Sequence, residues 1–272
     1  MAIKKINRNL DIFIYGVKAF TPLVSNDVYK VLVNHDDPEE KFQTSLPIYR
    51  DYEGENISKD NLVYNEYTGL YWIWQNYPIK DYIGLNHYRR YYTFLDDIPN
   101  INEIFKKYKI VLNERFPLKI NNVPTNNRDF YAEWHNVEDF DLMGAIVKEL
   151  YPEYADGWDK MAESTYIYPS SIFIMPRRLF NTYMQYIFDV IDEFNDRRGC
   201  YTNEDYIAYV KAHESEYVRP KHAYYTVEMQ ARVVGYLIER CLCAFLMSGG
   251  KNSLEAHSIQ FPWKVYEVKY ND

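Results

Sequence analysis

The chain has 272 residues, of which 47% are hydrophobic, 26% are charged and 18% are aromatic, and its formal net charge is −8. These values are typical of a folded globular protein and exclude a disordered chain, while the acidic balance argues against a nucleic-acid partner. The 29 tyrosines suit wet, sugar-binding clefts, because each combines an apolar ring with a polar tip. An AT-rich genome would raise the same count.

The first half of the chain alternates between strands and helices. Apolar runs predict strands at residues 11–15 and 28–33, and a polar, irregular stretch follows over residues 34–62. The next predicted elements, in chain order, are a helix from Asn61 to Asn76 stopped by Pro78, a strand over 82–88, a helix over 101–108 and a strand over 109–113. The aromatic and aliphatic spacing of three and four residues is what predicts the first helix.

The second half is richer in helices. Residues 114–130 contain two prolines and four asparagines and are predicted to form a loop. The later predicted elements are a helix opening at Asp139 or Asp141 and reaching Leu150, a helix over 156–164, a strand over 171–175, helices over 177–195, 203–213 and 226–247, and an extended tail over 254–272. The whole pattern predicts a single α/β domain over residues 1–272, with a mostly parallel sheet and a helical C-terminal part.

No segment is expected to span a bilayer. The most apolar stretch, 233–247, follows Arg232 and contains Glu239 and Arg240. We therefore expect a soluble, cytoplasmic protein with at most a weak peripheral contact at the inner face of the cell membrane. Candidate lipid contacts are Lys4, Lys5 and Arg8, or Arg177 and Arg178.

Several familiar catalytic signatures are missing. The sequence contains no GxGxxG, P-loop, GxSxG or HExxH motif, and its six histidines show no metal-ligand spacing. The three cysteines, Cys200, Cys241 and Cys243, are expected to be free thiols, and the last two are expected to be buried in a helix.

The segment YIGLNHYRR carries the strongest functional signal. In open parallel sheets, ligands bind beyond the carboxyl ends of strands, so His87, Arg89 and Arg90 are predicted to face a cleft. Guanidinium groups hold phosphate oxygens with two hydrogen bonds at once. The alternative is that both arginines form surface ion pairs with Asp96 and Asp97.

Four segments together resemble one bacterial family. They are GENIS (54–58), NEYTGLYWIWQN with DYIGLNHYRRYY (65–92), YAEWHNVEDFDL with its helix (131–150), and QARVVGYLIER (230–240). The resemblance covers roughly residues 50–247, and its block 65–92 is highly specific. The family acts in capsular and exopolysaccharide biosynthesis, was long described only as a domain of unknown function, and is now regarded as a family of GT-A-type glycosyltransferases.

The resemblance implies a nucleotide-sugar substrate and no separate cofactor. Where GT-A enzymes normally carry an Asp-x-Asp metal site, this chain has Asn86, His87 and Tyr88, so protein cations are expected to replace the metal. Asp139-Phe140-Asp141 imitates the metal pattern but opens a predicted helix, where acidic residues serve the dipole. We expect no metal site.

The N-terminal end of the site departs from the family. Family members usually have a histidine after the first strand, whereas Val17 occupies that position here. The resemblance still places Lys18 near the nucleotide.

Further candidates come from the helices. Asn65 and Glu66 either line the cleft or cap their helix, and His135 and Asp139 either act on the acceptor or serve capping and packing. Arg232 and Glu239, seven residues apart, share one helical face and must be paired or face the cleft. Trp134 either packs in the core or stacks on a sugar. The candidate catalytic residues are Asp139, Glu66, Glu239 and His135, and the candidate donor-binding residues are His87, Arg89, Arg90, Lys18, Asn65 and Arg232.

The sequence thus predicts transfer of a sugar, from a UDP-hexose, to a lipid-linked oligosaccharide in surface-polysaccharide assembly. One alternative is a non-catalytic carbohydrate-binding or assembly protein with the same fold. Another is a nucleotidyl- or phosphotransferase, which would need acidic metal ligands at the strand ends.

Overall fold

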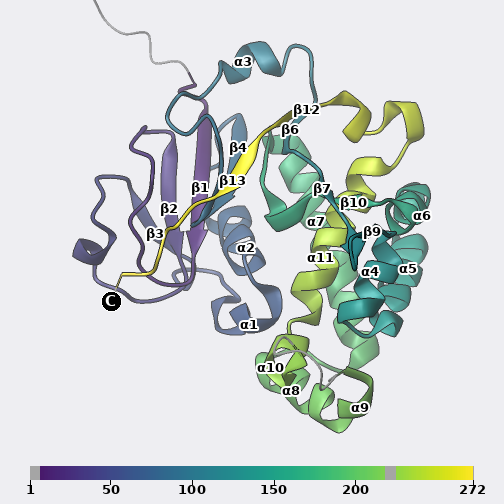
Figure 1. The fold of residues 1–272 in the computed structure, drawn as a ribbon. Coiled ribbons are helices and arrows are strands. Elements are labelled where there is room, and N and C mark those ends of the chain that lie inside the picture. The colour runs from purple at the N-terminus through teal and green to yellow at the C-terminus, as the bar shows by residue number, and fades with distance from the viewer. Residues whose placement is uncertain (1–6, 218–224, 272) are drawn as a thin grey trace, which may run out of the picture.

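A computed structural model describes residues 7–217 and 225–271 of the chain (Figure 1). Its centre is a sheet in which seven strands follow the order β12-β6-β11-β4-β1-β2-β3. These strands are β1 (Leu10–Gly16), β2 (Tyr29–Val33), β3 (Ile48–Arg50), β4 (Tyr82–His87), β6 (Ile110–Asn113), β11 (Phe173–Pro176) and β12 (Ser258–Phe261). Neighbours are parallel except at β11, which runs antiparallel to β4 and β6. The predicted α/β class with a mostly parallel sheet is confirmed.

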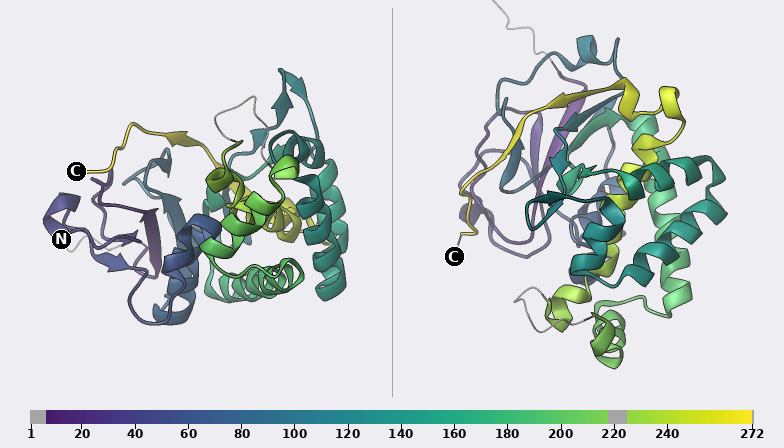
Figure 2. Two further views of the ribbon diagram at one scale, coloured as in Figure 1. Left: turned by 90° about the horizontal axis from the view of Figure 1, so that it is seen from below. Right: turned by 45° about the vertical axis from the view of Figure 1, so that its right-hand side comes forward.

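The two faces of the sheet are covered by different parts of the chain. On one face, strand residues such as Phe13 and Leu85 pack into the larger core with the helices, which gather on one side of the molecule (Figure 2). The helices on this side are α1 (Asn61–Tyr64), α2 (Tyr67–Asn76), α4 (Asn127–Trp134), α5 (Val137–Leu150), α6 (Ala155–Glu163), α7 (Arg177–Arg198), α8 (Asn203–Ala212), α9 (Glu214–Tyr217), α10 (Val227–Gln230) and α11 (Val233–Met247). On the other face, Ile12 and Ile14 pack into a smaller core with the short helix α3 (Ile101–Ile104), loops and the C-terminal tail.

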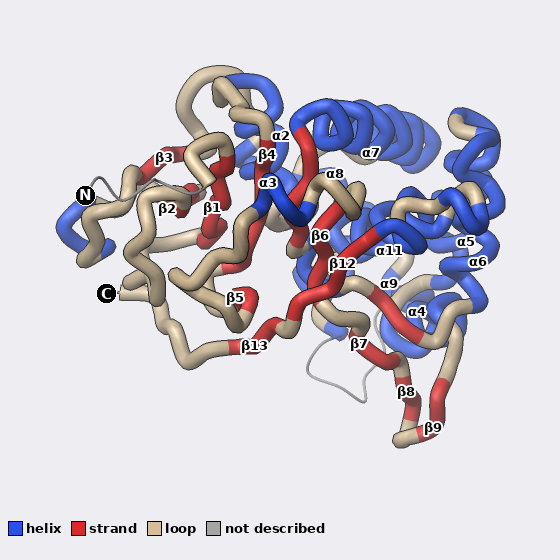
Figure 3. Tube along the Cα trace, turned by 90° about the horizontal axis from the view of Figure 1, so that it is seen from above, coloured by secondary structure: helices blue, strands red, loops and turns tan. Residues whose placement is uncertain are grey.

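The C-terminal tail crosses the sheet. After β12 it forms β13 (Trp263–Val265), which pairs with the short strand β5 (Arg90–Tyr92), as Figure 3 shows. The tail then continues to Tyr270, which bridges to Phe20 beside the end of β1. Two small ribbons lie outside the central sheet, β7 (Phe116–Pro117) with β10 (Tyr166–Ile167) and β8 (Lys119–Ile120) with β9 (Val123–Pro124).

Several predicted boundaries need correction. The helix predicted from Asn61 to Asn76 is broken, because Asn65 has φ +53° and separates α1 from α2. The stretch 34–62 contains the strand β3, and the loop 114–130 contains short strands and the start of α4. The helix predicted over 226–247 is two helices, α10 and α11, with Arg232 between them.

The ends of other helices lie closer to their predicted positions. Helix α5 begins at Val137 with Asn136 as its N-cap, two residues before Asp139, because the Asn136 side chain accepts the N–H of Glu138. Helix α3 ends at Ile104 rather than at residue 108. The cysteines Cys241 and Cys243 are buried in α11, as predicted.

Parallel pairing places strand ends on two distinct edges of the sheet. We call the edge where β1 and β4 end, at Gly16 and His87, the carboxyl edge, and the edge where β4 and β6 begin the amino edge. Because β11 is antiparallel, the residues that precede it also reach the carboxyl edge.

Candidate functional site

Polar side chains from distant segments meet at the carboxyl edge around a narrow cavity of about 60 Å³. We call it the polar cavity. It is lined by Tyr15, Gly16, Val17, Asn61, Asn65, Glu66, His87, Arg232 and Tyr270. Four predicted site residues, Asn65, Glu66, His87 and Arg232, are therefore brought together although they come from three different parts of the sequence.

His87 is uncharged at neutral pH. Desolvation of its ring, together with the positive charges of Arg90, Arg89 and Arg232, lowers its pKa to about 3. The backbone N–H of Arg89 donates to Nδ1 of His87 over 3.5 Å, a long contact that favours the tautomer with its hydrogen on Nε2. His87 therefore offers a ligand a hydrogen-bond donor instead of a positive charge.

Three guanidinium groups surround His87. Arg90 opens β5 and lies opposite His87 in the register, whereas Arg89 is exposed with its Cζ 5.6 Å from the ring centre of Tyr88. Within the described part of the chain, neither these two arginines nor Arg232 forms an ion pair with a carboxylate. Their charges are available to an anion.

The predicted alternative of surface ion pairs with Asp96 is not observed. The carboxylate of Asp96 instead accepts the backbone N–H groups of Ser25 and Asn26, at 2.9 and 2.8 Å.

The break between α1 and α2 shapes the wall of the polar cavity. The carboxamide oxygen of Asn65 accepts two hydrogen bonds from the guanidinium of Arg232, one of them at 2.9 Å from Nε. A Cβ on Gly235 would lie 1.8 Å from Nδ2 of Asn65, so only glycine lets α11 approach this closely. Neither Asn65 nor Glu66 caps α2 through its side chain, so the capping alternative is not observed.

Glu66 has the most perturbed carboxyl group of the polar cavity. Burial and the negative charge of Glu239 raise its pKa to about 7, although Arg90 and Arg232 act in the opposite direction. A carboxyl group that titrates near neutral pH suits proton transfer.

Glu239 is fixed differently. It lies on α11, and its Oε1 accepts the backbone N–H of Ser170 at 2.8 Å, while its Oε2 lies 3.5 Å from Nη1 of Arg240. Ser170 reaches the carboxyl edge because it lies three residues before the start of the antiparallel strand β11. These contacts fix both carboxylate oxygens of Glu239.

A buried network supports the polar cavity from behind. The Asp51 carboxylate accepts hydrogen bonds from Thr68 at 2.7 Å, Tyr15 at 3.1 Å and Asn34 at 3.0 Å, and its burial raises its pKa. Asn61 donates to the Tyr15 hydroxyl at 2.7 Å. Sequence reasoning missed Tyr15, Asp51 and Asn61, and only their proximity in the fold identifies them.

The tail contributes a further missed residue, Tyr270. Its ring stacks on Tyr88 with the centroids 4.5 Å apart, and its hydroxyl accepts the backbone N–H of Val17 at 3.2 Å. Val17 lines the polar cavity, while the neighbouring Lys18 is exposed and is not one of the lining residues.

Asp139 lies in a different environment. It is buried, with Oδ1 2.6 Å from Nη2 of Arg198 and Oδ2 accepting the Tyr217 hydroxyl at 2.7 Å. Burial raises its pKa to about 6 against the opposing effect of Arg198. Asp139 lines neither the polar cavity nor the cavity that contains His135. Asp141, the other acid of the imitated metal pattern, forms an exposed ion pair with Arg128.

His135 belongs to an aromatic cavity of about 390 Å³ next to the polar one. The aromatic cavity is lined by Phe130, Trp134, His135, Tyr225, Met229, Arg232 and Tyr236. Arg232 lines both cavities, so they adjoin. Because α4 extends to Trp134, His135 and Trp134 lie at the end of a helix and not in a loop.

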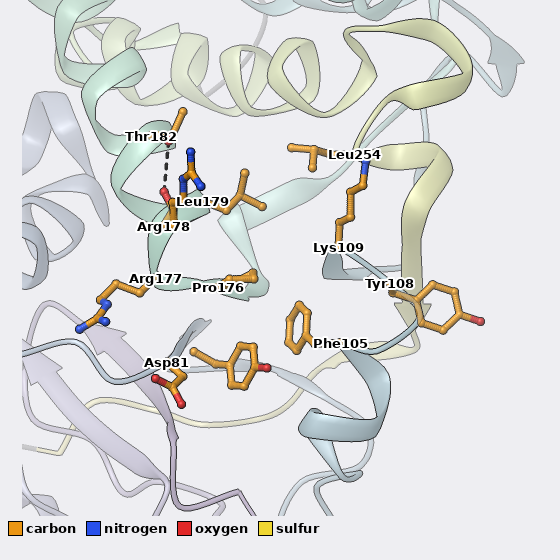
Figure 4. A pocket seen from close by; sticks show the side chains of 11 residues that line it. Asp81, Phe105, Tyr108, Lys109, Pro176, Arg177, Arg178, Leu179, Thr182 and Leu254 are labelled. Atoms are coloured by element: carbon orange, nitrogen blue, oxygen red, sulfur yellow. Dashed lines mark hydrogen bonds between the residues drawn. The ribbon is translucent and has the colours of Figure 1, made fainter.

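A larger cavity, of about 640 Å³, opens at the amino edge (Figure 4). We call it the amino-edge cavity. Lys109 lies on one side of it and Arg177 on the other, with Pro176 and Phe105 between them. The guanidinium of Arg177 donates to the backbone oxygen of Ile79 at 3.2 Å.

Residues 7–217 and 225–271 contain no group of three His, Cys, Asp or Glu side chains arranged to hold a metal ion. Over the same residues, no helix combines the length and apolar character needed to cross a membrane. The proposed lipid contacts Lys4 and Lys5 lie outside the described residues.

Comparisons with known proteins give a family and a fold. A family model described as "Domain of unknown function (DUF4422)" matches residues 12–251. No curated protein matches the chain. Among solved structures, the apo structure of the bifunctional glycosyltransferase WbbM is similar, with a TM-score of 0.72 and 20% identity over 97% of this chain and 46% of that chain. The present chain thus spans less than half of WbbM. The likeness agrees with the predicted GT-A-like α/β class.

Proposed function

We propose that this chain, which belongs to the DUF4422 family, is a glycosyltransferase that moves a sugar from a nucleotide-sugar donor to a growing surface polysaccharide. The fold shared with the glycosyltransferase WbbM supports this class of reaction. The donor we propose is a UDP-hexose, and the acceptor is a lipid-linked oligosaccharide of capsular or exopolysaccharide assembly.

One observation carries the proposal. At the carboxyl edge, a carboxyl group with a pKa near 7 lies beside guanidinium groups that have no carboxylate partner among the described residues. Sugar transfer from a nucleoside diphosphate requires a base for the acceptor hydroxyl and positive charge for the leaving group. Glu66 supplies the base, and Arg90 and Arg232 supply the charge.

The transfer step can be written with these groups. The acceptor hydroxyl gives its proton to Glu66 as its oxygen bonds to C1 of the donor sugar. The bond between C1 and the diphosphate oxygen breaks, and the nucleoside diphosphate leaves with the electron pair. Arg90, Arg232 and the Nε2–H of His87 stabilise the charge that develops on the leaving group.

We further propose that the reaction needs no metal ion. The position where an Asp-x-Asp motif would lie holds Asn86, whose side chain is fully buried, and His87, which lines the polar cavity. In an assay with excess EDTA we expect full activity. Loss of activity with EDTA and recovery with Mn²⁺ would show that a cation, and not the arginines alone, holds the diphosphate.

Mass spectrometry with a panel of UDP-, GDP- and dTDP-sugars tests the function directly. We expect one donor to be hydrolysed slowly in water and transferred faster when a saccharide acceptor is added. A chain that binds saccharides but turns over no donor would instead be a non-catalytic carbohydrate-binding protein. The apolar Val17, where family members usually carry a histidine, is the observation that favours this second candidate.

We propose that the protein acts in the cytoplasm, on the inner face of the cell membrane, through weak peripheral contacts. The described candidates for contact with anionic lipid are Arg8, which is exposed, and Arg177 and Arg178 at the start of α7.

A further inference from the structure

The aromatic cavity is unusual in its composition. Of the seven described residues that line it, five have aromatic rings, counting the imidazole of His135, and Arg232 is the one cation among these seven. Such a surface offers flat apolar faces and few hydrogen-bond partners, so it suits a ligand with an apolar face and polar edges.

The rings are held in place by the ends of α4 and α11. The ring of Trp134 stacks on Tyr225 with the centroids 6.0 Å apart, and the His135 ring stacks on Tyr236 at 4.0 Å. Gln230 ties the two walls together, because its Nε2 donates to the backbone oxygen of Trp134 at 2.9 Å and its Oε1 lies 3.2 Å from Nδ1 of His135. The walls of the cavity are therefore preorganised.

The aromatic cavity adjoins the polar cavity. Arg232 lines both cavities, and Tyr236 and Glu239 follow it by one and two turns on the same face of α11. A ligand in the aromatic cavity thus lies across Arg232 from the polar cavity, which Glu66 lines.

We infer that the aromatic cavity is the acceptor subsite, and that it binds a hexopyranose unit by stacking the C–H face of the ring on Trp134 and Phe130. This inference rests on the proposed function and identifies the substrate class of its second site. A pyranose fits the chemistry because its C–H groups form an apolar face while its hydroxyl groups project from the rim. The donor diphosphate then occupies the polar cavity, on the other side of Arg232.

The first test is binding, which does not require turnover. In saturation-transfer NMR with the methyl glycosides of glucose, galactose and mannose, we expect ring C–H signals of at least one glycoside with wild-type protein. We expect this transfer to be lost in Trp134→Ala and Phe130→Ala and kept in Phe105→Ala, which removes a ring from the amino-edge cavity. No transfer in the wild-type protein, or equal loss in Phe105→Ala, would overturn the inference.

The second test separates the two substrates. With the donor identified by mass spectrometry and octyl hexopyranosides as acceptors, Trp134→Ala should raise the acceptor KM at least about tenfold and leave UDP affinity unchanged. If Trp134→Ala weakens UDP binding equally, the aromatic cavity holds the nucleobase. If no donor is turned over by the wild-type protein, the proposed function fails, while the NMR result still decides whether the aromatic cavity binds a sugar.

Discussion

The polar cavity at the carboxyl edge is the smaller of two cavities at opposite edges of the sheet, but its ionisable side chains are the more strongly coupled. The amino-edge cavity is about ten times larger, yet its cations Arg177 and Lys109 lie apart, and Arg177 is already bonded to a backbone oxygen. In the small polar cavity, by contrast, Glu66 and His87 lie close enough to Arg90 and Arg232 for the positive charges to affect the pKa of both. Volume therefore says less about a site than the electrostatic coupling of its side chains.

Replacing a carboxyl group at each edge should give the largest difference in kcat between the two edges. Glu66→Gln removes the proposed base, and we expect a fall in kcat of about 10²- to 10⁴-fold, because general-base catalysis contributes that much. Steady-state kinetics measure this effect. Asp81→Asn, the matched change in the amino-edge cavity, should leave kcat unchanged, and comparable losses in both variants would remove the distinction between the edges.

Arginine substitutions should give the next largest difference. We expect Arg90→Ala and Arg232→Ala each to weaken UDP binding by about 10- to 150-fold, the cost of one charge-assisted fork of about 1.5–3 kcal/mol. Arg89→Ala should have a smaller effect, because Arg89 is exposed. Isothermal titration calorimetry provides the values, with Arg178→Ala as the control. Unchanged affinity in both inner-arginine variants would contradict the proposed donor site.

The pH dependence of activity should report the coupling of Glu66 to Glu239. Because Glu66 acts as a base only when ionised and its pKa is raised to about 7, kcat/KM should rise with pH, with a midpoint near pH 7, and then level off. Glu239→Gln removes the neighbouring negative charge, so the midpoint of this rise should move to lower pH. A midpoint that stays in place in Glu239→Gln would show that the titrating group is not Glu66.

The smallest expected effect is on the binding of the amino edge to anionic membranes. Each cation near an anionic bilayer contributes about 1 kcal/mol, so the double variant Arg177→Gln and Arg178→Gln should weaken co-sedimentation with anionic vesicles at low salt by tenfold or more. High salt should abolish binding by the wild-type protein. Strong binding that resists salt would contradict the weak electrostatic contact, and Arg89→Gln serves as the control at the carboxyl edge.

The sequence predicted those elements that appear as a continuous run or a regular spacing of apolar residues. Strands β1 and β4 are buried runs, and the residues that follow β4 lie at the sheet edge where a parallel topology places ligands. The break at Asn65 was missed because the helical spacing of apolar residues continues across it, although asparagine is one of the few residues that tolerate positive φ. Strand β3 was missed because it has three half-buried residues and no alternating pattern.

Other site residues have no local signal. Tyr15 and Asp51 look like ordinary strand and loop residues, and only the pairing of β1 with β2 and β2 with β3 brings them together. Asp139 carried the helix-opening pattern expected of an exposed acid, but its burial beside Arg198 is a tertiary contact. The single-domain boundary over residues 1–272 stays a prediction.

The path of the tail determines how late in translation the polar cavity can be completed. Gly16 is among the first residues of the polar cavity to emerge, but Tyr270, which completes its wall, follows more than two hundred residues later. At about 5–20 residues per second, the cavity stays unfinished for roughly 13 to 50 s of synthesis. During that interval the small core also lacks Phe261 and Trp263, so its apolar surface is exposed to chaperones or to other nascent chains. The wall of the polar cavity therefore cannot be completed before Tyr270 has been synthesised and the tail has crossed the sheet.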